Sequence, residues 1–282
     1  MDKKIIFLTV ICFFALFLQF VPIKSIKPAS AYPFYKRMVE YDLKSSFYTD
    51  FSSSTKERAH NIKLCSSKIN GTILECGEEF SFNKTVGKRS IKNGYKTAKI
   101  IVDGKFVDGI GGGVCQVSTT LYNAVILAGL EVIECHPHSL GVSYVSPSFD
   151  AMVSSTSDLR FINNTNGPLL INVSASNGVL KVKIHGEKNC YKYERQSETC
   201  EVIPEPEPEI IYDDTLYQDV SNIVSYGKTG LKSKGYILKY RDGKLIEKRL
   251  IRKDTYKPIK AVILKGTKHI EINDGTNAQI NI

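Results

Sequence analysis

Residues 109–145 read GIGGGVCQVSTTLYNAVILAGLEVIECHPHSLGVSYV, and the fold class follows most directly from this segment. Apolar side chains recur at helical spacing from residue 116 to residue 130, where Gly129 helps to end the helix. The stretches beyond it that read as strands between Asn, Gly and Pro turns are EVIECH, SYV, LRFIN, LLINVSA and VLKVKIH. A helix leading into an antiparallel β-sheet predicts an α+β domain over residues of about 48–190.

Upstream of this segment, the sequence predicts a second helix and a hairpin. Residues 55–68 repeat apolar positions at roughly helical spacing. Residues 72–74 and 80–82 read as short strands, and residues 100–107 read as a hairpin about an Asp-Gly turn.

Residues 201–209, EVIPEPEPE, alternate proline with glutamate. Proline removes backbone donors and like charges repel, so we expect a stiff, solvated spacer at 201–210. Residues 211–282 then read as a small, mainly-β module with a hairpin at 236–247 and a strand at 270–272. Its lysines alternate with apolar positions, as a sheet with one wet face requires.

Composition excludes disorder and leaves the nature of an anionic partner open. The 282 residues are 42% hydrophobic and 24% charged, within the globular range, and carry a net charge of +9. Residues 220–282 hold 14 Lys+Arg against 5 Asp+Glu, so the whole excess lies in this segment. It points to an anionic wall polymer, or to a solvated face that binds nothing.

The N-terminus has the pattern of an export signal. Lys3 and Lys4 precede the apolar stretch IIFLTVICFFALFLQFVPI at 5–23, and Ala29-Ser30-Ala31 follows. Residues 1–31 therefore read as a secretory signal peptide or an uncleaved membrane anchor, with a buried cytosolic helix as the alternative. Either of the first two places the protein outside the cytoplasm, at the cell envelope. Export argues against nucleic acid as the partner, and no aromatic platform favours it.

Six cysteines lie outside this segment, an even number that invites disulfides in an exported chain. Cys190 and Cys200 are the pair that we expect. A Cys115–Cys135 disulfide is less plausible, because it would silence the best candidate nucleophile. A zinc site is conceivable with the ligands Cys115, Cys135, His136 and His138, but their spacing matches no familiar finger, and we expect neither metal nor cofactor.

The candidate chemistry centres on Cys115. Three glycines, Gly111, Gly112 and Gly113, lead into a helix start, where unpaired N–H groups favour a thiolate and can hold an oxyanion. His136 and His138 follow about twenty residues later as candidate bases, and Asp150 or Asp158 could orient the imidazole. Papain-like and transglutaminase-like enzymes use this order. The alternative is structural: a buried cysteine under a glycine loop, a histidine bound to a carbonyl, and an aspartate that fixes a turn.

Several motifs together resemble the VanW family over roughly residues 48–185. They are GEEFSFNKTVGKR, NGYKTAKIIVDGK, GGGVCQVSTTLYNA, PHSLGVSYV and DLRFINNTNGPLLI. The C-terminal segment, with YRDGK and KPIKAVILKGT, is similar to part of the G-five module of cell-wall proteins. The resemblance implies a bacterial cell-envelope protein from a family named after type B vancomycin resistance, and supplies no proven reaction.

The family pattern also ranks the site residues. It holds at Gly111, Gly112, Gly113, Cys115, Gln116, Ser118, Leu121, Tyr122, Asn123, His138, Ser139, Asp150, Asp158 and Asn164. It favours His138 over His136 as the base. It departs at Cys135, where a basic residue is usual, and at Cys76, where proline is usual. The first departure removes a positive charge from beside the suspected site.

Two functions follow as hypotheses. The first is an accessory protein that recognises peptidoglycan or an anionic wall polymer, with substrate-binding residues at Gly111, Gly112, Gly113, Gln116, Ser118, Tyr122 and Asn123. The second is a cysteine-dependent acyl-transfer or amide-cleaving enzyme that acts on peptidoglycan, with Cys115 as nucleophile, His138 as base and Asp150 as the orienting carboxylate. The membrane is a further partner if the N-terminal segment is not cleaved.

Overall fold

The structure is a computed structural model that describes residues 42–102, 104–188 and 190–269. The predicted export segment and the predicted strand at 270–272 lie outside these residues. None of the helices within the described ranges is both long enough and apolar enough to cross a membrane.

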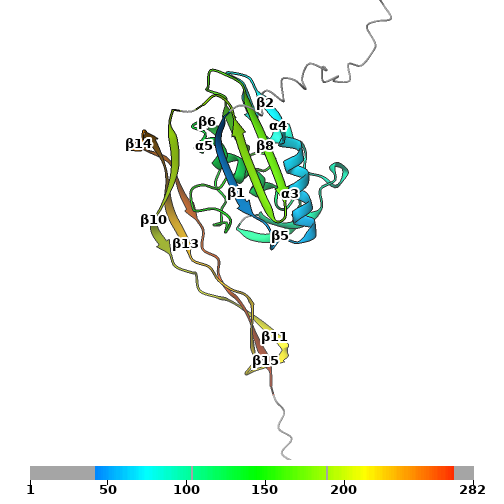
Figure 1. Cartoon of the computed structure of the whole chain (residues 1–282). Helices are drawn as coiled ribbons and strands as arrows, with labels where there is room; N and C mark the ends of the chain where they lie inside the picture. Colours follow the sequence, from blue (N-terminus) through cyan, green and yellow to red (C-terminus); the bar gives the residue numbers. More distant parts are fainter. Residues whose placement is uncertain (1–41, 103, 189, 270–282) are drawn as a thin grey trace, which may run out of the picture. The chain divides into compact units, whose positions relative to one another are not determined.

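The first domain, residues 42–188, is built on a four-stranded antiparallel sheet in the order β1-β9-β8-β2 (Figure 1). The strands are β1 (Leu43–Asp50), β2 (Thr72–Leu74), β8 (Leu169–Ser176) and β9 (Val179–His185). In β9 the side chains of Leu180, Val182 and Ile184 are buried and alternate with exposed ones, so one face of the sheet meets the core.

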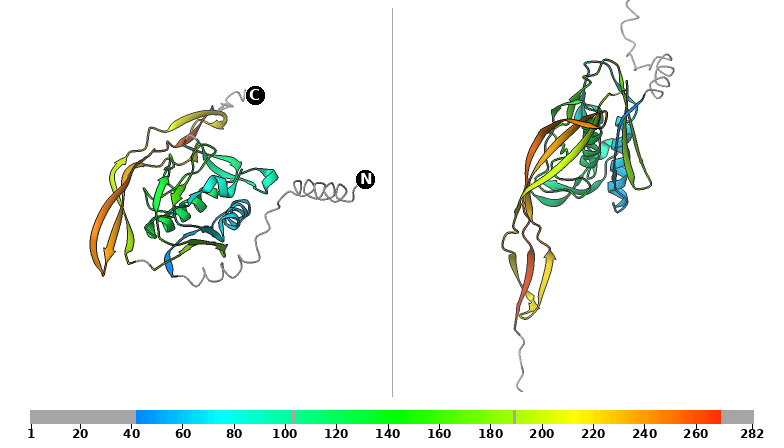
Figure 2. Two further views of the ribbon diagram at one scale, coloured as in Figure 1. Left: turned by 90° about the horizontal axis from the view of Figure 1, so that it is seen from above. Right: turned by 60° about the vertical axis from the view of Figure 1, so that its left-hand side comes forward.

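Two helices cover that face, α3 (Lys56–Ile69) and α5 (Val114–Leu127), as the view from above shows (Figure 2). The helix α3 begins at a capping side chain, because the Thr55 hydroxyl accepts from the N–H of Arg58. Nearly all of α5 is buried, including its polar side chains, so it is the central element of this domain. The residues packed around α5 therefore determine the geometry of the candidate site.

Smaller elements surround the ends of these helices. A three-stranded sheet has the order β3-β7-β6, and β4 pairs with β5 as a hairpin. The bounds are β3 (Glu79–Ser81), α4 (Phe82–Val86), a 3₁₀ turn η1 (Ile91–Asn93), β4 (Thr97–Val102), β5 (Lys105–Ile110), β6 (Glu131–Glu134) and β7 (Arg160–Ile162).

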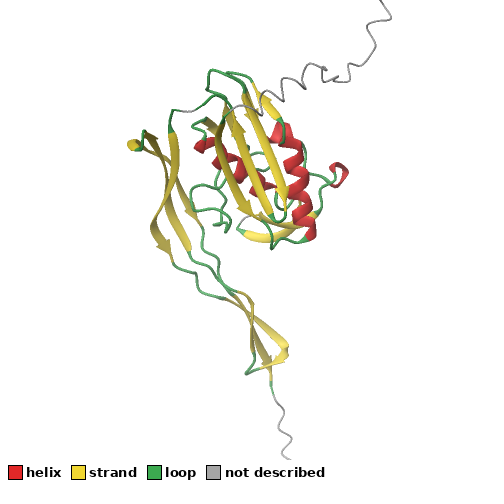
Figure 3. Ribbon diagram, viewed as in Figure 1, coloured by secondary structure: helices red, strands yellow, loops and turns green. Residues whose placement is uncertain are grey.

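The second domain, residues 190–269, consists of two three-stranded sheets joined by extended connections (Figure 3). One is antiparallel in the order β10-β13-β14, and the other, β11-β15-β12, contains one parallel pair. The bounds are β10 (Lys192–Ile203), β11 (Glu209–Tyr217), β12 (Ser221–Ser225), β13 (Gly230–Arg241), β14 (Lys244–Tyr256) and β15 (Val262–Lys268).

The predicted α+β class is confirmed, and most of the expected elements are present. The first helix is displaced by one residue at each end, and the second begins at Val114, two residues before its predicted start. The predicted strand at 143–145 is wrong, since these residues form a bend. The strand β1 was not predicted, because LKSSFYTD lacks a regular apolar alternation.

The segment 201–210 does not separate the two domains as expected. The strand β10 continues to Ile203, pairs with β13, and is followed by β11 from Glu209. Only residues 204–208 lie outside strands, because the three prolines there have no N–H to give to a ladder. This short proline segment joins two strands of the second domain.

The expected Cys190–Cys200 disulfide is absent, and both residues are exposed free thiols. The cause is the extended strand β10 between them. A strand advances about 3.3 Å per residue, so its eight steps from Lys192 to Cys200 cover about 26 Å. A disulfide needs Cα atoms within about 7 Å.

Candidate active site

Cys115 is the second residue of α5, at the end of the glycine loop. Gly113 caps the helix with a φ of 103°, which side chains rarely adopt, and a Cβ there would lie 2.9 Å from Ile62. The amide of Asn61 in α3 holds the loop through the Gly112 carbonyl at 3.0 Å. Cys115 is half-buried, and its Sγ lies 3.5 Å from the Val153 carbonyl oxygen.

The His138 ring connects Cys115 with Asp150. Its Nδ1 lies 2.7 Å from Asp150 Oδ2, and the same oxygen accepts from the His138 main-chain N–H at 2.6 Å. The ring also interacts with the Cys115 thiol, because each of the two groups shifts the pKa of the other. Since Asp150 occupies Nδ1, Nε2 is the ring nitrogen that remains for the thiol. His138 is 5% exposed and Asp150 is 1% exposed.

The ionisation of the three groups favours a charged pair. Burial lowers the pKa of His138, but its hydrogen bonds to Asp150 and Cys115 outweigh burial and raise this pKa to about 9. Burial also raises the pKa of the Cys115 thiol, yet the hydrogen bond and charge of His138 bring it below its ordinary value. Burial opposes ionisation of Asp150 as well, but the bond to His138 and further contacts hold its pKa at about 2. A thiolate beside an imidazolium is the form that these shifts favour.

The second domain holds the other side of Asp150. From β14, Arg252 Nη2 lies 3.1 Å from Asp150 Oδ1, and the Tyr256 hydroxyl donates to the same oxygen at 2.5 Å. Arg252 Nη1 donates to the Asp150 carbonyl oxygen. The orienting carboxylate therefore has partners from both domains.

The turn before Asp150 depends on the second domain too. Ser148 has a φ of 65°, a strained value for a residue other than glycine. Its N–H donates to the Tyr256 hydroxyl at 2.8 Å, and its hydroxyl lies 2.7 Å from that of Ser233 in β13. These contacts maintain the backbone that aims Asp150 at His138.

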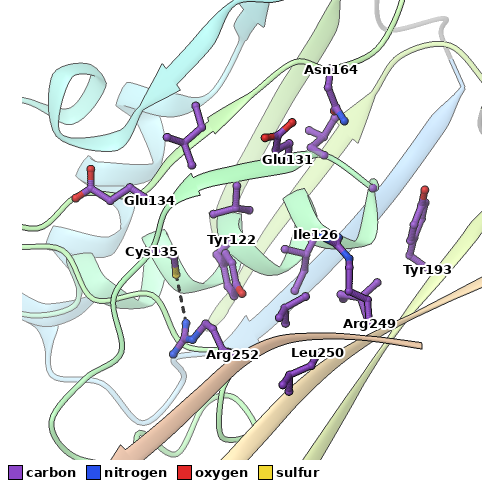
Figure 4. Close-up of a pocket in the computed structure, with 16 residues that line it drawn as sticks. Tyr122, Ile126, Glu131, Glu134, Cys135, Asn164, Tyr193, Arg249, Leu250 and Arg252 are labelled. Carbon is purple, nitrogen blue, oxygen red and sulfur yellow. Dashed lines mark hydrogen bonds between the residues drawn. The ribbon is translucent and has the colours of Figure 1, made fainter. Parts of the chain in front are cut away.

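Arg252 also places a positive charge beside Cys135, where the family pattern was expected to have a basic residue. Arg252 Nη1 lies 3.3 Å from Cys135 Sγ, as the dashed line in Figure 4 shows. Burial raises the pKa of the Cys135 thiol to about 12, so the thiol is neutral beside the guanidinium. A cation of the second domain thus lies beside Cys135.

Arg252 stands at the edge of a pocket of about 550 Å³ between α5, β6 and β14. Figure 4 shows Tyr122 and Ile126 projecting from the helix toward Arg249, Leu250 and Arg252 of the strand. Neither Cys115 nor His138 lines this pocket. It adjoins the site through Arg252 and Cys135.

The polar residues of α5 support the site from within the core, and substrate binding by Gln116, Ser118 and Asn123 stays a prediction. All three are at most 1% exposed. Ser118 donates to the Ala151 carbonyl at 2.6 Å and Asn123 to that of Phe149 at 2.8 Å, so both hold the segment around Asp150.

Gln116, Tyr122 and the glycines have structural roles as well. Gln116 donates to the Asp50 carbonyl at 2.7 Å and thereby links α5 to β1. Tyr122 is buried, and its ring lines the pocket of Figure 4. Gly112 packs against β4, where a Cβ would lie 2.5 Å from the Lys99 carbonyl oxygen. Each of these residues therefore has a packing role in the fold, and their predicted role in substrate binding stays a prediction.

The two alternate candidates, His136 and Asp158, are bonded to residues outside the group formed by Cys115, His138 and Asp150. His136 Nε2 lies 2.9 Å from Glu134 Oε1, and its side chain is 41% exposed. Asp158 accepts from the Ser81 hydroxyl at 2.6 Å and the Asn83 N–H at 2.8 Å, so it holds the start of α4. The four zinc-ligand candidates do not converge, and the described ranges contain no cluster of three or more metal-ligating side chains.

Sequence reasoning missed five residues around the site: Arg58, Arg89, Tyr144, Arg252 and Tyr256. Arg252 and Tyr256 are more than 100 residues from Asp150 in sequence. Arg58 lies outside the quoted motifs, whereas Arg89 ends GEEFSFNKTVGKR and Tyr144 lies within PHSLGVSYV. The two motifs were a signal for Arg89 and Tyr144, but no local pattern assigns any of the five residues to the surroundings of Cys115.

Comparison with known families gives two matches. The family model described as VanW like protein matches residues 57–185, and that described as G5 domain matches residues 194–268. The second match begins inside β10, before the proline segment, as the strand pairing does.

Two curated proteins are similar to the first domain. The uncharacterized protein YoaR of Bacillus subtilis (strain 168) is 44% identical over 140 residues, which cover 49% of this chain and 46% of that protein. The vancomycin B-type resistance protein VanW of Enterococcus faecalis (strain ATCC 700802 / V583) is 30% identical over 83 residues, 29% of this chain and 30% of that protein. The chain therefore spans less than half the length of either relative.

Two solved structures are similar to the second domain. The crystal structure of HP0197-G5 is 26% identical and covers 27% of this chain and 97% of that chain, with a TM-score of 0.17. The IgA1 protease G5 domain structure is 23% identical and covers 29% of this chain and 99% of that chain, with a TM-score of 0.20.

The domain limits change the meaning of the net charge. Residues 194–268 contain 15 Lys+Arg and 12 Asp+Glu, so the segment that matches the G5 model carries only +3. The acidic residues of β10, the proline segment and β11 offset the lysines that follow. The concentration of charge after residue 220 is a property of a segment and not of a folded unit.

Proposed function

We propose, from the premise that residues 57–185 are a VanW-like domain and residues 194–268 a G5 domain, that this protein is a cysteine-dependent acyl-transfer enzyme of the cell envelope. The observation that carries the proposal is the His138 ring, which is hydrogen-bonded to the buried Asp150 carboxylate and lowers the pKa of the Cys115 thiol. A nucleophile, a base and an orienting group in this order are the parts that thiol catalysis requires.

The first half of the reaction forms a thioester. The Cys115 thiolate attacks the carbonyl carbon of an amide, and the electron pair of the C=O bond moves to oxygen, near the positive end of α5. Collapse of this tetrahedral species breaks the C–N bond, and the His138 imidazolium gives its proton to the departing amine. Asp150 holds the ring in one orientation throughout.

The second half releases the acyl group. An incoming amine or water attacks the thioester carbonyl, and neutral His138 takes the proton of that nucleophile. The Cys115 thiolate leaves, which restores the starting pair. An amine acceptor gives a new amide, and water gives hydrolysis.

The proposed substrate is a peptide amide of peptidoglycan. Support comes from the export pattern at 1–31 and from the similarity to a protein named for vancomycin B-type resistance. In this proposal the protein works outside the membrane and alters the peptide that a glycopeptide antibiotic recognises. A link to resistance is then a consequence of the reaction.

The test uses the full exported chain with muropeptides and mass spectrometry of the products. We expect new or cleaved amides with the wild type, and none with Cys115→Ser or His138→Gln. Cys200→Ser is the matched control, because Cys200 is an exposed thiol remote in sequence from the site. Equal product formation by wild type and Cys115→Ser would refute the enzymatic function.

For the G5 domain we propose wall recognition, which one observation favours. The sheet β11-β15-β12 exposes large apolar and aromatic side chains: Ile210, Ile211, Tyr212, Tyr217, Ile223 and Val224. Since the domain carries only +3, we expect these side chains rather than charge to bind wall sugars and peptides. Sedimentation with isolated wall should weaken in Tyr212→Ser and change little with salt. A steep loss with salt would restore the anionic polymer as the partner.

A further inference from the structure

Two arginines beside Cys115, Arg58 and Arg89, have no carboxylate partner among the described residues. Within the same ranges the half-buried Arg195 has none either, but its guanidinium lies over the rings of Phe47 and Phe149. Arg58 donates to the Ser54 hydroxyl at 2.6 Å and to Gln116 Oε1 at 2.7 Å. Arg89 donates to Asn83 Oδ1 and to the Ser154 carbonyl, both at 2.6 Å. All four acceptors are neutral. Throughout the described ranges, neither arginine forms an ion pair, whereas Arg252 and Arg160 each meet two carboxylates.

Both guanidinium groups belong to the surroundings of the thiol. Arg58 bonds Gln116, the residue after Cys115, and its Cγ lies against the backbone of Gly113. Arg89 bonds the carbonyl of Ser154, next to the Val153 carbonyl that contacts Cys115 Sγ. The charges of both arginines act on Cys115. The two cations therefore flank the reacting sulfur, one from α3 and one from the loop before η1.

The third side chain of this site is Tyr144, which contributes a neutral hydroxyl. Tyr144 lies close enough to Thr119, Arg58 and Cys115 for all three to influence its pKa. Burial raises the pKa of Tyr144, so it stays a phenol that can donate a hydrogen bond. A guanidinium has five N–H groups, and two hydrogen bonds on each arginine leave three to offer.

We propose that Arg58 and Arg89 form an anion subsite that recognises a carboxylate of the acyl donor, so the substrate is a peptide with a free carboxylate close to the scissile amide. The proposal rests on the proposed function and names its substrate class. Half-buried cations without carboxylates are costly unless an anion joins them, and a bidentate guanidinium–carboxylate bond supplies both charge and orientation.

The first test needs no substrate, because it compares two electrophiles at Cys115. Iodoacetate is an anion and iodoacetamide is its neutral analogue, and both react with the thiolate. We expect Arg58→Gln and Arg89→Gln each to lower the ratio of the iodoacetate rate to the iodoacetamide rate about threefold, as loss of a nearby unit charge does. In Arg58→Lys, the ratio of the iodoacetate rate to the iodoacetamide rate should stay close to the wild-type value. Arg160→Gln, at a paired arginine, is the matched control.

The result that would overturn the subsite is an unchanged ratio, or an equal slowing of both electrophiles. Equal slowing would mean that the arginines only stabilise the thiolate. Labelling at each cysteine is read by peptide mass spectrometry, and thermal unfolding checks that each variant is folded. Failure of the proposed function is a separate result, because it appears as slow labelling of Cys115 by both reagents in the wild type.

The second test uses the muropeptide reaction. Amidation of the donor's carboxylate should raise KM about tenfold in the wild type, as loss of one charged hydrogen-bonded pair does, and should have little effect in Arg58→Gln. Equal use of amidated and free donors by the wild type would overturn the assignment.

Discussion

Arg252 in the G5 domain and Asp150 in the VanW-like domain are bonded twice, once through the Asp150 side chain at 3.1 Å and once through its carbonyl oxygen. Arg252 is 12% exposed and Asp150 is 1% exposed. The carboxylate that orients His138 is therefore fixed by a cation from a different domain. Chemistry at Cys115 and the docking of the G5 domain should be coupled.

Arg252→Gln should destabilise the protein by about 3 kcal/mol, because breaking a buried ion pair leaves Asp254 and part of Asp150 without a cation. Urea unfolding gives the free energy. Arg249→Gln is the matched control, since Arg249 is exposed on the same strand. Similar losses in the two variants would contradict a specific role for Arg252.

Tyr256→Phe should cost about 1–3 kcal/mol, because the Ser148 N–H loses its buried acceptor and Asp150 loses a donor. It should also raise the pKa of Asp150 and lower that of His138, which NMR titration of the imidazole measures. Tyr226→Phe, at a tyrosine that is 79% exposed, should do neither. An unchanged His138 titration in Tyr256→Phe would argue against coupling between the domains.

Stability should depend on pH through both His138 and Asp150. The folded pKa of His138, about 9, exceeds its ordinary 6.5, so its contribution is complete below pH 6.5 and disappears as pH rises through 9. The folded pKa of Asp150, about 2, lies below 3.8, so its contribution is present above pH 3.8 and disappears as pH falls through 2.

The loss of stability at alkaline pH is measured by comparing wild type with His138→Gln. The quantity of interest is the difference in unfolding free energy between the two proteins. This difference should shrink by about 3 kcal/mol between neutral and alkaline pH, since each pKa unit is worth about 1.4 kcal/mol. His136→Gln, at an exposed ring, is the control. Parallel curves for wild type and His138→Gln would show that the imidazole carries no raised pKa.

Gly112→Ala should cost about 1–3 kcal/mol and reduce Cys115 labelling, because the new Cβ meets the Lys99 carbonyl oxygen at 2.5 Å and displaces the loop before the nucleophile. Gly141→Ala is the control, since nothing lies within 4 Å of a Cβ there. We expect its effect to stay within about 0.5 kcal/mol. If Gly112→Ala is as stable as the wild type and its Cys115 is labelled as fast, the loop can move to accommodate the methyl group and the prediction is wrong.

Local signals account for the parts of the fold and site that could be predicted. The helix around Cys115 follows from a 3.6-residue apolar period behind a glycine loop, and both act through neighbouring residues. Cys115, His138 and Asp150 could be predicted as site residues because their side chains are of the types that thiol catalysis uses. The limit of the G5 domain escaped prediction, since KYERQSETCEVI in β10 has no apolar period and draws its stability from pairing with β13.

The sequence by itself determined the α+β class, the place of Cys115 at a helix start and the side chains capable of thiol chemistry, because each depends on contacts within a few residues. Only the tertiary structure decided that Asp150 rather than Asp158 meets His138, and that Arg252 and Tyr256 complete its surroundings. The ionisation of a buried carboxylate depends on whichever charges and donors packing brings within a few ångströms, and here those come from more than 100 residues away.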